Sequence, residues 1–326
     1  MRGKTAFVTG GSGFIGGRLV ERLAGEGWTV RGLARSDAAA ARIAELGGEP
    51  VRGELGDRGS IAAAAAGAEL AFHLAAQLGE WRPWEEFERG NVEGTENALD
   101  GCAEAGVRRF VHCGTEAALM AGRPLVEADE RAPLRPDSPA PYPATKARAE
   151  LRVRRANRRG FETVTVRPRF VWGLGDTTLL PEMVATVRRG QFAWIGGGRT
   201  LTATTHVDNV VEGLLLAAER GRPGEAYFVT DGEPVVFREF VTEMLRTQGV
   251  EPPERSLPAW SALPLARACE AAWRLLPLPG EPPMTTFRAW LLTQECTIEI
   301  DKARGELGYE PVVSREQGLS ELRAAV

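Results

Sequence analysis

The sequence predicts an α/β fold in which a doubly wound parallel sheet is followed by a smaller C-terminal lobe. Two observations carry this prediction. Short β-rich runs alternate with helical patterns up to residue 168, as in chains whose parallel strands are joined by crossover helices. A glycine-rich loop also lies between the first apolar run and the first amphipathic stretch. Beyond residue 168 the alternation fades, and from residue 237 helices, prolines and tryptophans dominate, which indicates the separate lobe.

The glycine-rich loop at residues 9–16 reads Thr-Gly-Gly-Ser-Gly-Phe-Ile-Gly and follows the apolar run 6–8. Glycines at 10, 13 and 16 allow a tight turn, a close approach of the backbone to a pyrophosphate, and close packing of the next helix. The N-terminus of that helix supplies oriented N–H donors for phosphate. The pattern predicts a dinucleotide site of the Rossmann type. The alternative is an ordinary strand-to-helix turn that is rich in glycine.

A second strand is expected at 28–34, and Arg35 follows it directly. In a doubly wound fold the end of this strand faces the adenosine ribose, where an acid binds the 2′-hydroxyl and an arginine accommodates a 2′-phosphate. Ala34 and Arg35 hold that place here, with no acid. Because a guanidinium makes bidentate bonds to phosphate, we expect NADP(H) to be favoured, with NAD(H) as the second choice. The alternative is a plain surface arginine.

The remaining strands of the sheet are expected at 50–55, 69–74, 108–115 and 161–168. His73, within one of these strands, is expected to be packed in the core. Ligands of such sheets bind beyond the carboxyl ends of the strands. We expect the cofactor to contact the following residues along that edge: Gly10, Ser12, Gly13, Phe14, Ile15, Gly16, Arg35, Glu54, Leu55, Leu74, Ala75, Ala76, Tyr142, Lys146, Pro168 and Val171.

A helix is expected from Tyr142 to Arg158, with Pro143 in its first turn, where a missing N–H costs nothing. Tyr142 and Lys146 are four residues apart, so they share one helix face. The positive end of the helix and the ammonium group both favour the phenolate, so we expect the pKa of Tyr142 to fall below its ordinary value of about 10. Such a tyrosine can transfer a proton to or from an alcohol oxygen. The alternative is an ordinary tyrosine and lysine on a helix.

Beyond the sheet, a strand is expected at 201–207, a helix at 208–220 and a short strand at 227–230. We therefore expect residues 1–170 to form the cofactor-binding domain, with contributions from about 201–230. Residues 171–326 are expected to form mainly the substrate lobe.

Composition and charge exclude several classes of function. The chain has 326 residues and a net charge of −4, which leaves no electrostatic footprint for nucleic acid. Four widely spaced cysteines and three histidines indicate neither a disulfide scaffold nor a metal site. With no leader before the first strand and no apolar run long enough to span a bilayer, we expect a cytoplasmic protein without an integral membrane segment. The least polar stretch, 257–278, is interrupted by prolines and charges, and we expect a lid or a core helix there.

The loop at 9–16 and the Tyr-x-x-x-Lys motif at 142–146 occur in one chain, and together they resemble the extended short-chain dehydrogenase/reductases of the NAD-dependent epimerase/dehydratase superfamily. The resemblance covers nearly the whole length. Further matches are Asn91-Val-x-Gly94-Thr95, a strand ending at Thr115, Arg167-Pro168 with Gly173, and His206-Val-Asp-Asn209.

By that resemblance Thr115 takes the place of the catalytic Ser/Thr, and Asn91 takes that of a structural or proton-relay Asn. Resemblance also implies that Lys146 binds the nicotinamide ribose, that residues after Pro168 contact the nicotinamide, and that helices after Asn91 and Tyr142 form a homodimer face. One departure is that Cys113-Gly114-Thr115 replaces the common serine run, so the hydroxyl role rests on Thr115 alone.

The branch that the chain resembles most is the 3β-hydroxysteroid dehydrogenase-like and dihydroflavonol reductase-like one. Arg35 is similar to the NADP-binding arginine of the reductases. Residues 202–206 read Thr-Ala-Thr-Thr-His, where nucleotide-sugar epimerases usually carry an arginine before the histidine.

These observations lead to one hypothesis with two rivals. The hypothesis is an NADP(H)-dependent alcohol dehydrogenase or carbonyl reductase that acts on an apolar, possibly steroid-like, small molecule through Thr115, Tyr142 and Lys146. The rivals are a nucleotide-sugar epimerase or dehydratase with tightly bound NAD, and a non-catalytic NADP-sensing protein. Candidate substrate contacts are Gln77, Trp81, Glu116, Trp172 and His206, and aromatic residues that could line the cleft are Trp81, Trp84, Phe87, Trp172, Phe192 and Trp194.

Overall fold

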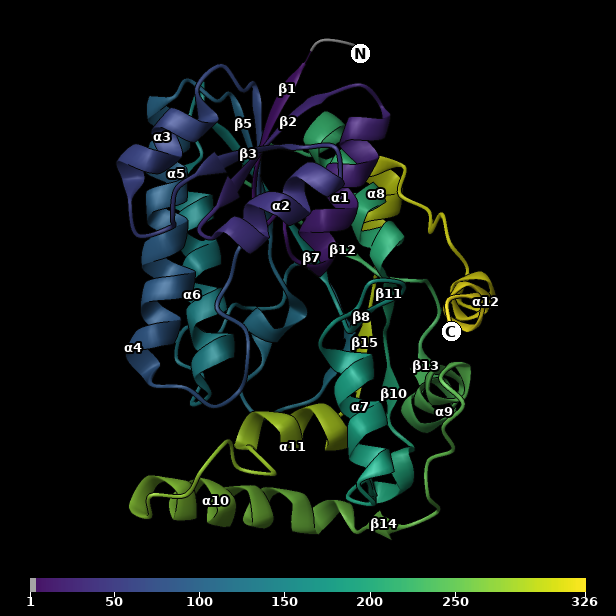
Figure 1. Cartoon of the computed structure of the whole chain (residues 1–326). Coiled ribbons are helices and arrows are strands. Elements are labelled where there is room, and N and C mark those ends of the chain that lie inside the picture. Colours follow the sequence, from purple (N-terminus) through teal and green to yellow (C-terminus); the bar gives the residue numbers. More distant parts are fainter. Residues whose placement is uncertain (1–3) are drawn as a thin grey trace.

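The protein is built on a seven-stranded parallel sheet, seen in a computed structural model that describes residues 4–326 (Figure 1). Its strands follow the order β12-β7-β5-β4-β1-β2-β3, and every pairing is parallel. This is the doubly wound arrangement that the sequence predicts. The strands are β1 (Thr5–Thr9), β2 (Thr29–Ala34), β3 (Glu49–Arg52), β4 (Leu70–His73), β5 (Arg109–Cys113), β7 (Glu162–Pro168) and β12 (Ala226–Val229).

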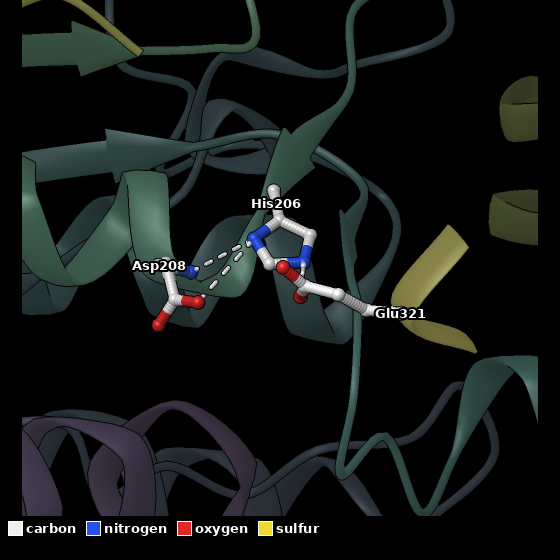
Figure 2. A group of neighbouring side chains, drawn as sticks. All are labelled: His206, Asp208 and Glu321. Atoms are coloured by element: carbon white, nitrogen blue, oxygen red, sulfur yellow. Dashed lines mark hydrogen bonds and ion pairs between the residues drawn. The ribbon is translucent and has the colours of Figure 1, made fainter. Parts of the chain in front are cut away.

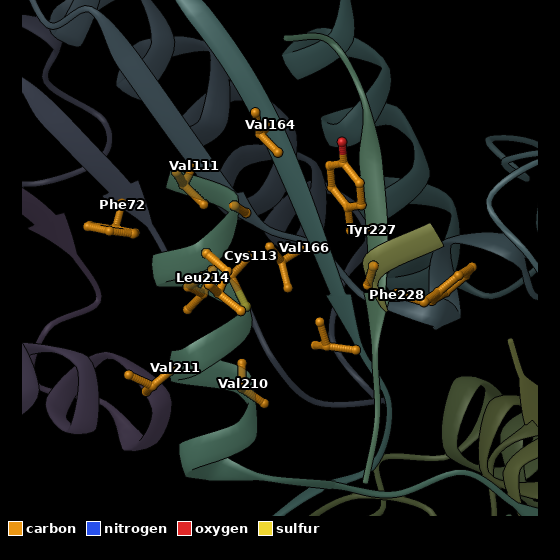
Figure 3. Close-up of a cluster of buried hydrophobic side chains, with 14 of the residues drawn as sticks. Phe72, Val111, Cys113, Val164, Val166, Val210, Val211, Leu214, Tyr227 and Phe228 are labelled. Atoms are coloured by element: carbon orange, nitrogen blue, oxygen red, sulfur yellow. The ribbon is translucent and has the colours of Figure 1, made fainter. Parts of the chain in front are cut away.

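Helices cover both faces of this sheet. One face carries α1 (Phe14–Gly25), α2 (Asp37–Glu45) and α8 (Val207–Arg220), and the other carries α3 (Arg58–Ala65), α5 (Gly94–Glu104) and α6 (Pro141–Ala156). Strands buried on both faces are apolar without alternation, which explains why Ala6, Phe7 and Val8 are all fully buried. Figure 3 shows the core beneath α8, where Val210, Val211 and Leu214 face Val111, Val164 and Val166 of the strands, with Tyr227 and Phe228 of β12 beside them.

The C-terminal half returns to the main sheet before it forms a lobe of its own. β12 pairs with β7 at the sheet edge, and α8 packs on the same sheet. The lobe contains a four-stranded sheet of order β13-β10-β15-β6, to which the N-terminal half contributes β6. These strands are β6 (Leu125–Ala128), β10 (Leu201–Thr202), β13 (Val235–Val236) and β15 (Cys296–Ile298), and two smaller pairs join β8 (Val171–Trp172) to β11 (Thr205–His206) and β9 (Trp194–Ile195) to β14 (Ser256–Leu257).

The lobe is otherwise helical. Its helices are α7 (Leu179–Arg188), α9 (Phe237–Thr247), α10 (Ala259–Leu275), α11 (Thr286–Thr293) and α12 (Arg315–Ala324), and a short helix α4 (Trp84–Phe87) precedes α5. Residues 88–93 and 303–307 are π-helical, and residues 116–119 and 196–198 form single 3₁₀ turns.

Three expectations about local structure are corrected. The strand expected at 50–55 ends at Arg52, so Glu54 and Leu55 lie in the following turn. The strand expected at 201–207 is two short pieces, because the chain pairs with β13 and β15 at Thr202 and then changes to β8 at Thr205. Within 257–278, residues Ala259–Leu275 form the peripheral helix α10, not a core helix: Trp260 is 79% exposed and Leu275 is 82% exposed. Across residues 4–326 no helix combines the length and apolar character needed to cross a membrane.

Candidate active site

The glycine-rich loop connects β1 to α1 with geometry that only glycine accommodates. Gly10 has a φ of +74°, and a Cβ there would lie 2.7 Å from the backbone N of Ala75. A Cβ on Gly16 would lie 2.1 Å from the carbonyl oxygen of Gly10. Gly13 is the N-cap of α1 and provides no side-chain cap, so the first N–H groups of α1 stay open to a ligand. This cradle fits the pyrophosphate of a dinucleotide.

The expected cofactor contacts lie along the carboxyl edge of the sheet. Leu74, Ala75 and Ala76 follow β4 and are partly buried, Pro168 is the last residue of β7, and Val171 begins β8. Ser12 is exposed at the loop, whereas Phe14 and Ile15 are partly buried in the first turn of α1. Glu54 is exposed beyond β3, and the carbonyl oxygen of Leu55 accepts a bond from Asn97. Most of the expected cofactor contacts thus lie at or just beyond the carboxyl ends of the strands.

Arg35 lies one residue beyond β2 and is exposed. Among residues 4–326, no carboxylate lies within ion-pair distance of its guanidinium, so the group is open to an anionic ligand. Sequence reasoning missed Arg52, which is paired in register with Ala34 and so stands at the same edge. Arg52 binds the carboxylate of Asp37. The sequence signal for Arg52 is its place near the end of β3, the strand that neighbours β2.

Tyr142 and Lys146 lie in the first turns of α6, as expected, and face the end of β5. The Lys146 ammonium is buried and donates to the carbonyl oxygen of Cys113 at 3.1 Å. Thr115 follows β5 and is nearly buried; its Oγ1 accepts from the backbone N of Ala117 at 3.2 Å. The pKa of Tyr142 also reflects a hydrogen bond with Thr115. The structure thus brings Thr115, Tyr142 and Lys146 together at one strand end.

The expected fall in the pKa of Tyr142 is wrong for the protein without a ligand. Burial raises that pKa well above its ordinary value, the carboxylate of Glu116 raises it further, and the hydrogen bond with Thr115 opposes these effects only weakly. Burial also lowers the pKa of Lys146. Desolvation disfavours the charged form of each group, and it outweighs the attraction on which the expectation relied.

Asn91 holds the site together from within the π-helical segment. Its Oδ1 accepts from the backbone N of Gln77 at 2.7 Å, and its Nδ2 donates to Gln77 O and to Thr145 Oγ1. Because both ends of the amide are occupied, Asn91 ties the loop after β4 to the helix that carries Tyr142. This geometry favours the structural role over the proton relay.

His73 extends the same network to the glycine-rich loop. Its Nδ1 is 2.7 Å from Thr9 Oγ1, and its Nε2 is 3.0 Å from Thr95 Oγ1. The ring is buried, and burial lowers the pKa of His73 to about 3. A neutral histidine that is packed and bonded in this way is a core residue, as expected.

Helix α11 covers the tyrosine, and sequence reasoning missed this. The Phe287 ring lies 5.8 Å from the Tyr142 ring. The helix is tied to the loop after β4, since Thr285 Oγ1 donates to Glu80 at 2.6 Å and Arg288 Nε donates to Glu80 at 3.0 Å. In the same loop, Trp81 lies under the guanidinium of Arg274. The only sequence signal for this contact is the Thr-x-x-Arg pattern of Thr285 and Arg288 at the start of an apolar helix.

Three of the expected substrate contacts are corrected. Glu116 is buried, and its two carboxylate oxygens accept from Arg169 and from the Thr115 hydroxyl. The side chains of Trp172 and His206 are both fully buried, and Trp172 Nε1 donates to Asp231 Oδ2 at 2.7 Å. Figure 2 shows that both ring nitrogens of His206 face groups of the protein. Its Nδ1 accepts from the backbone N of Asp208, so that His206 caps α8, and Glu321 of α12 approaches its Nε2.

The carboxylate of Asp208 in that group is held by Arg18 at 2.5 and 3.0 Å. Because Arg18 already pairs with Asp208, the arrangement favours a helix cap over a cation site. Phe87 and Trp194 are also buried, Phe192 packs on Trp194, and Trp84 packs under Arg148. Of the six aromatic residues considered, Trp81 alone lies in the loop that is tied to α11.

Comparison with known proteins identifies the family. Residues 7–259 match the model of the 3-beta hydroxysteroid dehydrogenase/isomerase family. The chain belongs to this family. It is a NAD(P)-dependent oxidoreductase of the extended short-chain dehydrogenase/reductase type, because its relatives are reductases and dehydrogenases over the full length.

Among these family members, a 4-hydroxy-2-methyl-3-oxo-4-farnesyl-3,4-dihydroquinoline-1-oxide ketoreductase from Stigmatella aurantiaca is 46% identical over 98% of this chain and 96% of its own. A 2-alkyl-3-oxoalkanoate reductase from Stenotrophomonas maltophilia is 36% identical over 98% of both chains. The crystal structure of gox2253 superposes with a TM-score of 0.80 at 31% identity, covering 99% of this chain and 98% of that one.

A UDP-glucose 4-epimerase from Thermotoga maritima superposes with a TM-score of 0.76 at 20% identity, over 98% of this chain and 97% of the epimerase. A dTDP-glucose 4,6-dehydratase from Streptomyces venezuelae, solved with NAD, gives 0.76 at 24%, over 98% and 96%. At these identities the likeness is one of fold, so family membership rests on the sequence matches.

Proposed function

We propose that the protein is an NADP(H)-dependent carbonyl reductase, or the corresponding alcohol dehydrogenase, for an apolar organic substrate. The observation that carries the proposal is the meeting of Tyr142, Lys146 and Thr115 at the end of β5, next to the phosphate cradle at 9–16. A proton donor and a second hydroxyl beside a dinucleotide floor are the groups that reduction of a carbonyl requires.

Each residue has a distinct part in this proposal. The nicotinamide supplies the hydride when it is bound. Tyr142 binds the carbonyl oxygen and gives its phenolic proton to that oxygen. Thr115, whose hydroxyl donates to Glu116 Oε2 in this structure, turns that hydroxyl to the same carbonyl oxygen when substrate binds. Lys146, now on the carbonyl oxygen of Cys113, turns to the ribose and holds it. The open N-terminus of α1 binds the phosphates.

The proposed substrate class is a ketone with apolar substituents. Phe287 faces Tyr142 and belongs to an apolar cluster with Ala117, Met120 and Trp290. An apolar wall of this kind favours alkyl or polycyclic groups next to the reacting carbonyl. The names of the two relatives from Stigmatella and Stenotrophomonas describe ketone reduction on a farnesylated quinoline and on alkyl oxoalkanoates, which supports the same class here.

The mechanism is tested by replacing Tyr142 with Phe. Loss of the proton donor should lower kcat by about 10²- to 10⁴-fold, while NADPH binding, followed by its fluorescence, stays close to that of the wild type. Tyr227→Phe is the matched control, because the Tyr227 hydroxyl bonds Glu306 and the backbone of Arg222 far from the site. Full turnover in Tyr142→Phe would exclude this mechanism.

A further inference from the structure

The loop that follows β4 is fastened to helix α11 by the side chain of Glu80. Thr285 Oγ1 donates to Glu80 Oε2 at 2.6 Å, and Arg288 Nε lies 3.0 and 3.2 Å from the two carboxylate oxygens of Glu80. The two charged side chains are partly buried, with 19% of Glu80 and 30% of Arg288 exposed. We call these contacts the Glu80 clasp. They join residues that are 205 and 208 positions apart, so the clasp links the edge of the main sheet to the lobe.

The clasp holds the first turn of α11 on both sides of Phe287. Thr285 is the N-cap of this helix, and its Oγ1 accepts from the backbone N of Arg288 while its own proton goes to Glu80. The Phe287 ring lies between these two residues in the chain, is buried, and stands 5.8 Å from the ring of Tyr142. A carboxylate that binds the residues on both sides of Phe287 therefore fixes where this ring stands relative to Tyr142.

The other side of the clasp is anchored in the candidate active site. In the loop after β4, the backbone N and O of Gln77 are both bonded by the side chain of Asn91, which also donates to Thr145 of α6. Glu80 follows three residues later. The contacts thus form a closed ring, which runs from α6 through Asn91 and the loop to Glu80, and through α11 back to Tyr142 on α6.

Arg288 has a second acidic neighbour, which shows how particular the contact with Glu80 is. Glu182 of α7 lies 3.4 Å from Arg288 Nη2, but its side chain is 60% exposed. Exposed ion pairs contribute little, whereas Glu80 accepts a charge-assisted bond and a hydroxyl bond at a partly buried place. Glu80 is therefore the partner that sets the position of the guanidinium, and Glu182 provides a natural comparison on the same arginine.

We infer that Glu80 is a positioning residue for the substrate: by clasping α11 to the loop after β4, it holds Phe287 against Tyr142 and so fixes the apolar wall beside the reacting ketone. The inference rests on the proposed function. Both carboxylate oxygens of Glu80 are occupied by α11, so Glu80 acts through Phe287 and not by touching the substrate. Loss of the clasp should weaken the binding of long apolar substituents and leave the phosphate cradle at 9–16 intact.

The kinetic test uses Glu80→Gln, which keeps the size of the side chain and removes its charge. KM for a long-chain ketone should rise about three- to ten-fold. The values of kcat, KM for NADPH and KM for a short, polar ketone should stay close to those of the wild type, because only binding of the apolar part of the substrate is lost. Glu182→Gln is the matched control: it removes the exposed partner of the same arginine and should change none of these values.

A double-mutant cycle shows whether Glu80 acts through Phe287. In the Phe287→Ala background, Glu80→Gln should raise KM for the long-chain ketone by less than about two-fold, because the ring that the clasp positions is already absent. A general loosening of the lobe would instead multiply the two effects. The inference is overturned by equal fold-changes in both backgrounds, by an unchanged KM for the long-chain ketone, or by an equal rise in KM for the short one.

Hydrogen exchange tests the clasp without turnover. The backbone amides of α11 should exchange about ten-fold faster in Glu80→Gln than in the wild type. They should keep their wild-type rates in Glu182→Gln, and so should the amides of α9 in both variants. Unchanged exchange of α11 in Glu80→Gln overturns the clasp. If α11 loosens as expected but the wild type reduces no apolar ketone with either cofactor, the proposed function fails while the clasp stands.

Discussion

The proposed preference for NADP(H) depends on one side chain at the carboxyl edge of the sheet, Arg35. Its guanidinium is exposed at the end of β2, where, under the proposed NADP(H) preference, a bidentate bond to the 2′-phosphate would contribute about 1.5–3 kcal/mol. Arg35→Ala should raise KM for NADPH by about ten-fold or more and leave KM for NADH nearly unchanged. Arg42→Ala, on the outer side of α2, is the control. If Arg35→Ala keeps the wild-type preference for NADPH over NADH, another residue must bind the 2′-phosphate, and Arg52 is the first to examine.

At the residue scale, the sequence predicts the positions that local chemistry requires. Gly10 and Gly16 are needed for a turn that no side chain permits, and Tyr142 and Lys146 are four apart on one helix, so both features can be derived without a structure. The buried pair of Glu116 and Arg169 cannot, since 53 positions separate its members. The raised pKa of Tyr142 cannot be derived either, because desolvation depends on long-range packing, which local spacing does not encode.

At the scale of elements, α11 is the part of the lobe that packs against Tyr142. Phe287 is largely buried against that tyrosine, and burying a phenylalanine contributes about 1.5–3 kcal/mol. Phe287→Ala should therefore raise KM for a long-chain ketone by about ten-fold, with a smaller effect on a short, polar ketone. Trp260→Ala, an exposed aromatic of α10, should change neither. Equal losses on both ketones would point to a general disturbance of the lobe.

The elements of the lobe were also the hardest to predict. The strands β8 to β11 and β13 to β14 contain two residues each, which is too short for a period of two to be recognised. They exist because distant segments meet, as when Thr202 pairs with both Val235 and Cys296. In the main sheet the strands contain four to seven residues and, apart from β3, are largely buried, and all seven lie within a few residues of their expected positions.

At the scale of the whole molecule, we propose a homodimer formed through α5 and α6. These helices lie side by side on one face of the sheet. The surface of α6 is basic, with Arg148, Arg152 and Arg155, and that of α5 is acidic, with Glu96 and Asp100; Arg152 and Glu96 already pair within one chain. A two-fold contact would set each basic helix against the acidic helix of the second copy.

Sedimentation velocity tests the dimer. We expect a dimer at low ionic strength that weakens as salt screens the exposed charges, and Arg152→Glu should weaken it further by placing like charges across the contact. Arg246→Glu, on the exposed side of α9, is the control. A protein that sediments as a monomer at every concentration and salt would exclude this assembly.

The path of the chain between its two halves has a consequence for how substrate range can change. After β7 the chain leaves the main sheet, forms part of the lobe, returns for α8 and β12, and leaves again, while the earlier segment β6 completes the sheet of the lobe. One recombination junction between two relatives would thus join mismatched strands in both sheets. A new lobe can be acquired intact only through paired junctions on either side of 207–229 and a second pair on either side of β6, so in this architecture new specificities arise more readily by substitutions around α11 than by exchange of whole lobes.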